Sequence, residues 1–138
     1  EKKLQVRIYF ENQDFCVLAD KVLMKQAISN VIHNALRYSN EGELVEIVLK
    51  KDKLSVKNYG VAIAAEDLEK IFEPFYCVDK SRSKKLGGSG LGLAITREII
   101  EEHGFSIIAR SQENRHEKIF DFLICFGGGK DERVDTKS

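Results

Sequence analysis

The 138-residue sequence has no excess charge of either sign, because 22 lysines and arginines balance 22 aspartates and glutamates. Nucleic acids and anionic membranes attract proteins through a summed positive field, so neither is expected as a partner, and any binding of phosphate must rely on local charges. Cysteine is also scarce. The three cysteines stand far apart without a C-x-x-C pair, which argues against a disulfide framework and a zinc knuckle and favours a reducing compartment.

Long apolar runs are missing as well. The densest run, residues 122–126, has five residues, whereas a membrane-spanning helix needs about 20. The N-terminus also lacks the apolar region of a signal peptide, so the chain itself is not expected to contact a membrane. Because it begins with Glu1 and not with Met, we expect a fragment of a longer protein. Its length and its 43% apolar residues are those of one globular domain.

Local patterns predict an alternation of strands and helices. Residues 4–10 and 15–19 are β-rich runs separated by a polar turn, which predicts a hairpin. Asp20 is placed to cap a helix that extends to about Tyr38, since apolar residues recur there at helical spacing. The other expected elements are strands over 44–50, 53–58, 105–110 and 118–126 and helices over 66–71 and 91–103. Gly104 is expected at the C′ position that ends the last helix.

This order of elements predicts an α+β fold, a two-layer α/β sandwich. Its sheet is expected to be mixed and mostly antiparallel, with helices on one face and water on the other. Residues 127–138 have no apolar periodicity, so a domain over 1–126 followed by a flexible tail is expected.

The first candidate site lies on the long helix. Gln26, Asn30, Asn34 and Arg37 fall within an arc of about 80°, at the border of the apolar face. Asparagine is a poor helix former, and its side-chain carbonyl is a suitable ligand for Mg²⁺. A binding strip and a solvated helix edge are both compatible with this feature alone.

The second candidate is the glycine-rich run at 87–93, directly before a predicted helix. Glycines let the backbone approach an anion, and the first N–H groups of the helix then point at phosphate oxygens. A polar, basic stretch precedes it, so neither a Rossmann turn nor a Walker A loop fits. Taken alone, the run is equally consistent with a flexible hinge. Residues 79–90 are nearly free of apolar side chains, so disorder without a ligand is expected there.

Two shorter candidates complete the set. One is the Asn-x-Gly-x-Ala segment at 58–62, and the other is Phe-Glu-Pro-Phe-Tyr at 72–76, which holds the only proline. Phe72 and Phe75 are placed to anchor one end of a mobile basic loop whose cations reach a ligand. The alternative is that both rings are ordinary core residues and that the cations are solvated.

In order and spacing, the four segments resemble the catalytic ATP-binding domain of two-component sensor histidine kinases. This domain, HATPase_c, has the Bergerat-type fold shared with gyrase, the heat-shock chaperone ATPases and MutL. The matching segments are NVIHNALRYS (30–39, N box), VKNYGVAI (56–63, first glycine box), FEPFY (72–76, F box) and GGSGLGLAI (87–95, second glycine box). The resemblance covers residues 4–126.

The resemblance implies that ATP and Mg²⁺ bind here. It implies that Asn34 coordinates the Mg²⁺ and that Arg37 faces the phosphates, so these two are the expected catalytic residues. The expected nucleotide-binding residues are Asn30, Asn34, Arg37, Tyr38, Asn58, Gly60, Ala62, Ile63, Arg82, Gly88, Gly90, Leu91, Gly92 and Leu93. Gyrase-like ATPases have a water-activating Glu where Asn30 stands. An amide cannot accept that proton, so phosphoryl transfer is favoured over a stand-alone ATPase.

The implied activity is transfer of the γ-phosphoryl group to a histidine on a separate dimerisation domain, for relay to a response regulator. None of His33, His103 and His116 lies in a phosphoacceptor motif, so the acceptor is expected outside this fragment. The fragment is expected to be the cytoplasmic domain of a membrane-anchored sensor kinase. Its expected partners are the phosphoacceptor helical domain of the same protein and the response regulator.

Three positions depart from the family pattern. Asn58 replaces an Asp that binds the adenine amino group, Ala62 replaces a glycine, and Cys77 replaces an Arg. A neutral acceptor is weaker than a charged one, so changing Asn58 to Asp together with Ala62 to Gly is expected to tighten ATP binding about tenfold. The alternative function is a regulatory or docking module of the same fold with impaired nucleotide binding.

Overall fold

The computed structural model describes residues 3–11, 15–76 and 91–127. Five strands form one sheet in the order β1-β2-β3-β5-β4. The elements are β1 (Gln5–Phe10), α1 (Lys21–Tyr38), β2 (Leu44–Lys50), β3 (Lys53–Tyr59), the 3-10 helices η1 (Ala65–Asp67) and η2 (Lys70–Phe72), α3 (Gly92–Glu102), β4 (Ser106–Glu113) and β5 (Lys118–Cys125).

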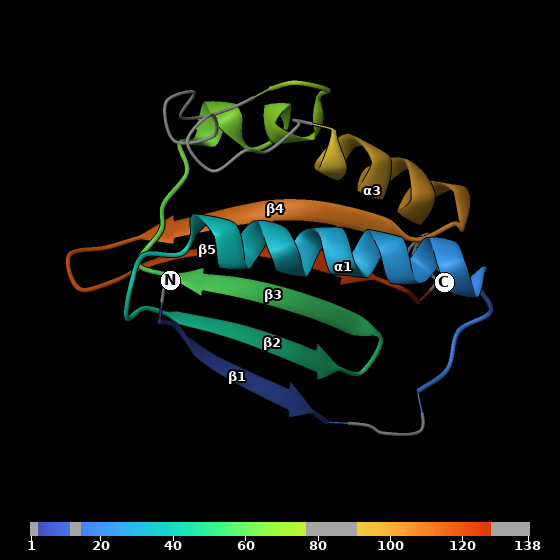
Figure 1. Ribbon diagram of the computed structural model, residues 1–138, viewed down its shortest axis with the longest axis horizontal. Coiled ribbons are helices and arrows are strands. Elements are labelled where there is room, and N and C mark those ends of the chain that lie inside the picture. Colours follow the sequence, from blue (N-terminus) through green and yellow to red (C-terminus); the bar gives the residue numbers. More distant parts are fainter. Residues whose placement is uncertain (1–2, 12–14, 77–90, 128–138) are drawn as a thin grey trace, which may run out of the picture.

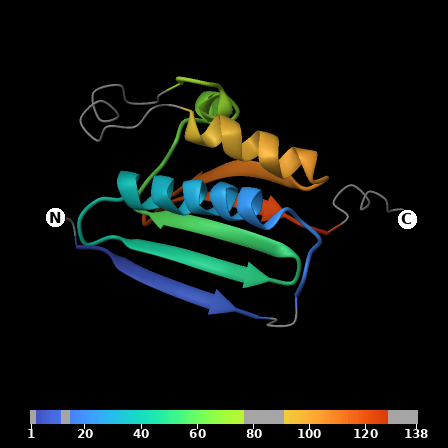
Figure 2. The same cartoon turned by 45° about the vertical axis from the view of Figure 1, so that its right-hand side comes forward.

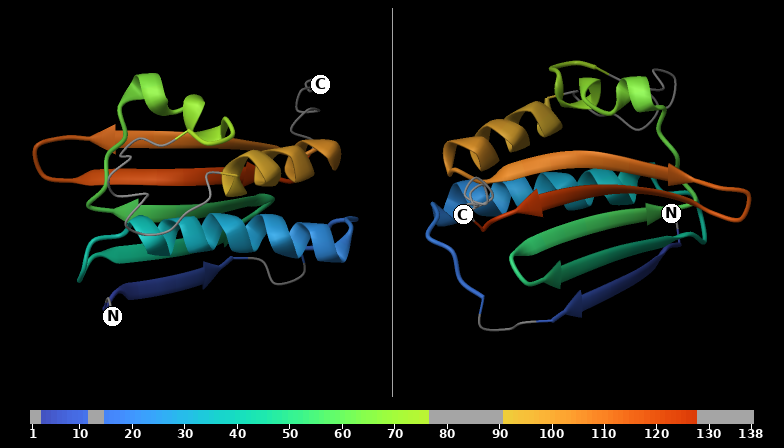
Figure 3. Two further views of the ribbon diagram at one scale, coloured as in Figure 1. Left: turned by 45° about the horizontal axis from the view of Figure 1, so that its top comes forward. Right: turned by 180° about the vertical axis from the view of Figure 1, so that it is seen from behind.

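Both α-helices lie on one face of this sheet (Figure 1). In the view from behind, the strands lie in front of the helices and leave the other face bare (Figure 3). The pairings β2–β3, β3–β5 and β4–β5 are antiparallel, and β1–β2 is parallel. The predicted α+β two-layer sandwich with a mixed, mostly antiparallel sheet is therefore confirmed.

The predicted hairpin of 4–10 with 15–19 is wrong. Residues 4–10 do contain β1, but β1 pairs with β2 in parallel, and 15–19 form no strand. Parallel neighbours need a crossover, and here the crossover passes through α1. Phe15 and Ala19 pack against the core instead, with the Phe15 ring 5.9 Å from that of Phe126. The apolar side chains of Phe15 and Ala19 thus contribute to the core and not to a strand.

The helix ends follow their capping residues. The Asp20 Oδ1 accepts a hydrogen bond from the Leu23 N–H at 2.9 Å, as predicted for an N-cap. Gly104 has φ +82°, and its N–H donates to the Glu101 carbonyl at 3.0 Å, which confirms the C′ position. The predicted helix at 66–71 is instead the two 3-10 turns η1 and η2.

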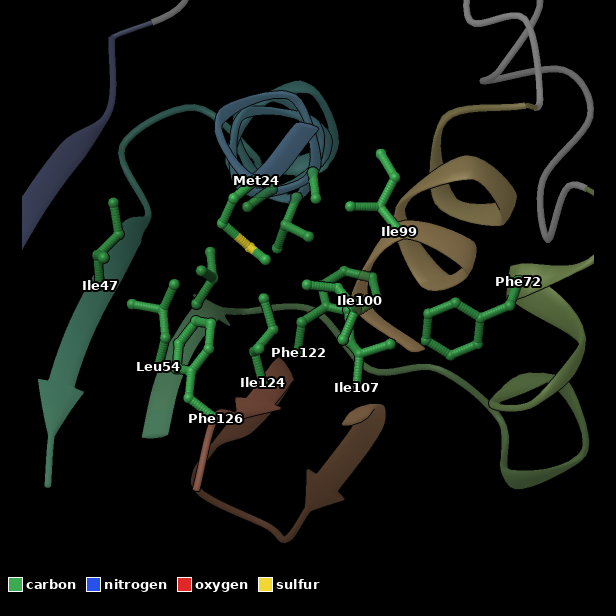
Figure 4. Close-up of a cluster of buried hydrophobic side chains, with 14 of the residues drawn as sticks. Met24, Ile47, Leu54, Phe72, Ile99, Ile100, Ile107, Phe122, Ile124 and Phe126 are labelled. Carbon is green, nitrogen blue, oxygen red and sulfur yellow. The ribbon is translucent and has the colours of Figure 1, made fainter. Parts of the chain in front are cut away.

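The core lies between the helices and the sheet (Figure 4). From α1 it receives Met24, Ala27, Val31 and Ala35, which recur every three or four residues on one side of the helix. Ile99 and Ile100 of α3 and Phe122 and Ile124 of β5 meet them (Figure 4). This packing fixes the positions of α1 and α3 over the sheet.

The edge strand β1 lies beyond this core. Figure 2 shows it at the rim of the sheet, away from α3. Val6, Ile8 and Phe10 pair in register with Val45, Ile47 and Leu49 of β2, yet all three remain exposed. Among the described residues, no helix has the length and apolar character that crossing a membrane requires.

Candidate functional site

The N box and the second glycine box meet where α1 passes α3. The Asn30 Nδ2 donates to the Gly92 carbonyl at 3.3 Å, and the Thr96 Oγ1 donates to the Ala27 carbonyl at 3.4 Å. Gly92 is the first residue of α3. Two segments 62 residues apart in the sequence are thus joined by a side-chain hydrogen bond.

The polar strip on α1 continues from Asn30 towards the C-terminal end of the helix. Asn34, Arg37 and Tyr38 are half-buried, whereas Gln26 is exposed. Arg37 and Tyr38 both take part in interactions within the protein. The Asn34 amide has no hydrogen-bond partner within the described part of the chain, so its carbonyl oxygen remains available to a ligand.

The residues fit an Mg²⁺ that is shared with a nucleotide. Within residues 3–11, 15–76 and 91–127, no three His, Cys, Asp or Glu side chains gather into a cluster that could hold a metal alone. Mg²⁺ is commonly bound through one or two protein oxygens together with substrate phosphates and water. The amide of Asn34, half-buried and without a hydrogen-bond partner among the described residues, suits such a site.

Asn58 of the first glycine box lies beneath the C-terminal end of α1. The residue is only 2% exposed. The Nδ2 donates to the Ala35 carbonyl at 2.8 Å and to the Ser39 Oγ at 2.9 Å. Ser39, which follows α1, is completely buried. Sequence reasoning did not identify the role of Ser39, although its position at the end of the N box was a signal.

Gly60 begins the loop that follows β3. It has φ +88°, a conformation that favours glycine, and its N–H donates to the Lys118 carbonyl at 2.8 Å. A Cβ atom there would lie 2.7 Å from the carboxyl carbon of Glu43. Further along the loop, Ala62 and Ile63 are half-buried. The backbone conformation therefore requires glycine at position 60, whereas the flexible Glu43 side chain can move aside.

The Ser111 side chain holds this loop from strand β4. Its Oγ accepts a hydrogen bond from the Ile63 N–H at 3.0 Å. Ser111 is 48 residues away in the sequence and belongs to none of the four boxes. No local pattern could have identified it.

A surface cavity of about 420 Å³ lies beside Gly60. Its lining residues are Glu43, Tyr59, Gly60, Asn114, Arg115, His116, Glu117 and Lys118. Burial and a hydrogen bond to Glu46 raise the pKa of Tyr59, so its hydroxyl stays protonated at neutral pH. Gly60 is the only predicted nucleotide-binding residue in this lining.

The F box divides into a buried and an exposed ring. Phe72 is buried, its ring stacks edge-on against Phe122 at 6.0 Å, and the Arg97 guanidinium lies 4.8 Å above it. Phe75 is 72% exposed with φ 65°, so the expectation that it anchors to the core is wrong. The reason is the turn after Pro74, which directs Phe75 outward. Of these two rings, only Phe72 lies in the core.

Tyr76 ends the F box and donates a hydrogen bond from its hydroxyl to the Asp67 Oδ1. This hydrogen bond, with a smaller contribution from burial, raises the pKa of Tyr76 to about 12. The bond connects the F box to η1.

Part of the predicted site lies outside the described residues, namely Arg82, Gly88 and Gly90, together with Cys77 and the expected lid at 79–90. The tail from residue 128 onwards lies outside them as well. At the border, Leu91 is the N-cap residue of α3, without a side-chain capping bond. Leu93 packs partly against the core. The first turn of α3 is thus placed beside Asn30 by the Gly92 contact.

Known proteins are similar to this chain in sequence and in fold. The sensor histidine kinase WalK of Bacillus subtilis (strain 168) is 42% identical over 110 residues, which cover 75% of this chain and 18% of WalK. The catalytic domain of the histidine kinase ThkA is 31% identical with a TM-score of 0.66, and the match covers 89% of this chain and 79% of that domain. A structure of ThkA in complex with the response regulator TrrA has 28% identity and a TM-score of 0.62, covering 92% of this chain and 35% of ThkA.

The chain therefore spans 18% of the length of the WalK relative. The model of the histidine kinase-, DNA gyrase B-, and HSP90-like ATPase family matches residues 19–127. That range contains α1, the glycine box around Asn58 and the start of α3. The chain belongs to this family of ATPases, and its relatives are sensor histidine kinases.

Proposed function

We propose that residues 1–126 form a catalytic domain that binds ATP with Mg²⁺ and, in the intact protein, transfers the γ-phosphoryl group to a histidine. The acceptor histidine lies on a separate dimerisation domain, and a response regulator receives the phosphoryl group next. The observation that carries this proposal is the convergence on α1. Asn30 binds the start of α3 and Asn58 binds the end of α1, so the first and second glycine boxes both contact the half of the helix that carries the N box.

Each residue has a chemical task in this proposal. The Asn34 carbonyl oxygen would hold the Mg²⁺, which when bound neutralises charge on the phosphates. Arg37 adds a positive charge on the same strip. The first turn of α3 offers backbone N–H groups to phosphate oxygens. Asn30 supports transfer over hydrolysis, because an amide that donates to the Gly92 carbonyl cannot serve as a general base.

The partners follow from the relatives. WalK is a sensor histidine kinase, and ThkA was solved in complex with the response regulator TrrA. We infer that this chain is the cytoplasmic part of a membrane-anchored sensor kinase and works with its own helical domain and a response regulator. Arg82, Gly88 and Gly90, which lie between Tyr76 and Leu91 in the sequence, are proposed to complete the phosphate site.

Phosphotransfer from labelled ATP tests the proposal. The chain is mixed with the helical domain of the same protein, Mg²⁺ and ATP labelled in the γ position, and acid-labile phosphohistidine is expected. Asn34→Ala should lower the labelling about 100-fold through loss of the metal ligand. His33→Ala is the matched control, since His33 is an exposed neighbour on α1 and its loss should leave labelling unchanged. Absence of label with the unmodified chain at millimolar Mg²⁺ and ATP would refute the proposal.

A second candidate is a regulatory or docking module with impaired nucleotide binding. It is favoured by Asn58 and Ala62, which stand where the family pattern has Asp and Gly. Calorimetry with a non-hydrolysable ATP analogue separates the two. Heat of binding that requires Mg²⁺ supports the kinase, and no heat at millimolar analogue supports the module.

A further inference from the structure

The sheet face opposite α1 and α3, here called the bare face, carries one complete row of charged side chains (Figure 3). Successive side chains of a strand point to opposite faces, so the sequence neighbours of core residues such as Val56 and Phe122 lie on the bare face. The strand register aligns five of these neighbours, one from each strand, as direct cross-strand partners. In the order of the strands they are Arg7, Glu46, Lys57, Asp121 and Arg110. Positive and negative charges therefore alternate across the whole sheet, and the row has a cation at each edge and one in the middle.

Both carboxylates of this row are held by the arginines at its ends. The Arg7 Nε donates to the Glu46 Oε2 at 3.0 Å, and the other oxygen of Glu46 accepts from the Tyr59 hydroxyl at 2.9 Å. Arg110 donates two hydrogen bonds to Asp121, at 3.2 Å from Nε and at 2.7 Å from Nη2. The side chains of the two carboxylates are 16% and 7% exposed, whereas those of their arginines are 60% and 50% exposed. The charged row therefore presents mainly cations to a partner.

Lys57 is the cation in the middle of the row. Its cross-strand partners are Glu46 and Asp121, whose carboxylates are each bound to an arginine. Lys57 is half-buried, and within residues 3–11, 15–76 and 91–127 it forms no ion pair. An ammonium group that is partly withdrawn from water and not paired gains most from a charged hydrogen bond with an incoming anion. The centre of the bare face thus suits a carboxylate from another molecule.

A second row of side chains lies beside the charged one, two residues away along the strands, and is uncharged. It consists of Tyr9, Val48, Ser55, Leu123 and Ile108, again aligned as cross-strand partners. Tyr9 is 52% and Ile108 is 43% exposed. Beyond this row, the exposed residues Lys50 and Lys53 pair in register, and the Lys53 Nζ lies 3.3 Å from the Asp52 Oδ1. Over β2 and β3, cations therefore border the uncharged row on both sides.

We propose that the bare face is a docking surface for an acidic amphipathic helix of a partner protein. The helix lies across the strands, with its apolar stripe on the uncharged row and its carboxylates on Arg7, Lys57 and Arg110. These three cations are two strands apart, which places them about 10 Å from one another. Residues seven apart on a helix share one side and are separated by about 10.5 Å, so acidic residues at heptad spacing match the cations. This surface is separate from the proposed nucleotide site, which lies on the side of the sheet that carries α1.

A helix of a protein fits the bare face better than a bilayer or a nucleic acid does. Polyanions are attracted by a summed positive field, and the chain has no net charge. Two of the three cations in the row are already paired with carboxylates of the same face. Apolar contacts bordered by polar and charged ones are the usual composition of an interface between proteins.

Fluorescence anisotropy of a labelled synthetic peptide tests the docking surface. The peptide is helical and carries glutamates seven residues apart, with leucines on the adjoining stripe of the helix. The wild-type chain should bind it with a Kd on the order of 10 µM, and Lys57→Glu should weaken binding at least about tenfold. Lys25→Glu is the matched control, because Lys25 is exposed on α1, on the other side of the sheet, and the change of charge is the same. This control should leave the Kd within about twofold of wild type.

Two further measurements guard the result against misfolding and unspecific attraction. Lys57→Met keeps most of the aliphatic side chain and adds no negative charge beside Glu46 and Asp121, and it should weaken binding about fivefold. A peptide of the same composition, with its glutamates moved to the far side of the helix, should bind wild type about tenfold more weakly than the first peptide. Equal binding of the two peptides, equal losses in the Lys57 and Lys25 variants, or no binding of the first peptide to wild type would overturn the proposal. Sedimentation with phosphatidylcholine–phosphatidylserine vesicles that is lost in Lys57→Glu, without binding of the peptide, would assign the bare face to a membrane and overturn it as well.

Discussion

The two ends of helix α1 are secured in different ways. At the N-terminal end, the Asp20 backbone N–H donates to the His103 Nε2 at 3.0 Å, and both groups are near the surface. The His103 Nδ1 lies 2.8 Å from the Ile99 carbonyl, which only accepts, so the ring carries its hydrogen on Nδ1. At the C-terminal end, the Asn58 amide is buried with Ala35 and Ser39.

The difference between these ends is burial. Water can replace a partner that is lost at the exposed end, whereas a buried carbonyl or hydroxyl that loses its partner bears the full desolvation penalty. At the C-terminal end, no group within residues 3–11, 15–76 and 91–127 donates to the Asn58 Oδ1. The predicted site residues therefore lie at the C-terminal end of α1, where loss of a buried hydrogen bond is expected to destabilise the fold most.

The largest effect is expected for Asn58→Ala. Removal of the amide leaves the Ala35 carbonyl and the Ser39 hydroxyl buried without this donor, so the free energy of unfolding should fall by about 3 kcal/mol. Urea denaturation measures it. The exposed Asn40→Ala should change the free energy by about 0.5 kcal/mol or less. Equal losses for both variants would contradict the contrast between the two ends.

A smaller loss is expected at the other end for His103→Ala. The variant loses the bond to Asp20 and the stacking of the His103 ring on Phe105, whose centroids are 6.0 Å apart. We expect the free energy of unfolding to fall by about 1.5 kcal/mol. His116→Ala, at an exposed position in the β4–β5 connection, is the control and should be nearly neutral. A loss of stability as large as that of Asn58→Ala would show that burial does not determine which substitution is the more destabilising.

The N-cap residue Asp20 should contribute less to the free energy of unfolding than His103 does. Asp20→Ala removes the acceptor for the Leu23 N–H and should lower the free energy of unfolding by about 1 kcal/mol. Asp20→Asn keeps an acceptor of the same shape and should retain most of the stability. Thermal denaturation of the two variants side by side measures the difference, and identical midpoints would exclude a capping role.

The smallest effect on stability is expected for the hydrogen bond between Tyr76 and Asp67, which lies away from α1 and is lost when Tyr76 ionises. The pKa of Tyr76 is raised to about 12 by its bond to Asp67. Since this is above the unfolded value of about 10, the stabilisation is complete below about pH 10 and is lost as pH rises through about 12. Ultraviolet absorbance should show a tyrosine that ionises near pH 12 in wild type and not in Tyr76→Phe. Late ionisation that persists in the variant would assign it to another tyrosine.

Much of the fold could be predicted from local patterns. The spacing of Met24, Ala27, Val31 and Ala35 predicted α1, and its boundaries at Asp20 and Tyr38 were confirmed. The segment 15–19 was misassigned because a short apolar, β-rich run fits an irregular core segment as well as it fits a strand. Pairing partners depend on contacts between distant segments, so the parallel β1–β2 pair could not be read from β1 alone.

Local patterns in the sequence established which residue types were available and which helix would carry them. The order of the boxes, the glycine at position 60 and the asparagines one turn apart on α1 were all visible without coordinates. The orientation of these side chains depends on contacts between segments that are distant in the sequence. Whether Asn58 offers an oxygen or a nitrogen depends on the Ala35 carbonyl, and the loop at Ile63 depends on Ser111, 48 residues away. A hydrogen bond is fixed by the partner that packing brings within about 3 Å, and no local pattern contains that distance.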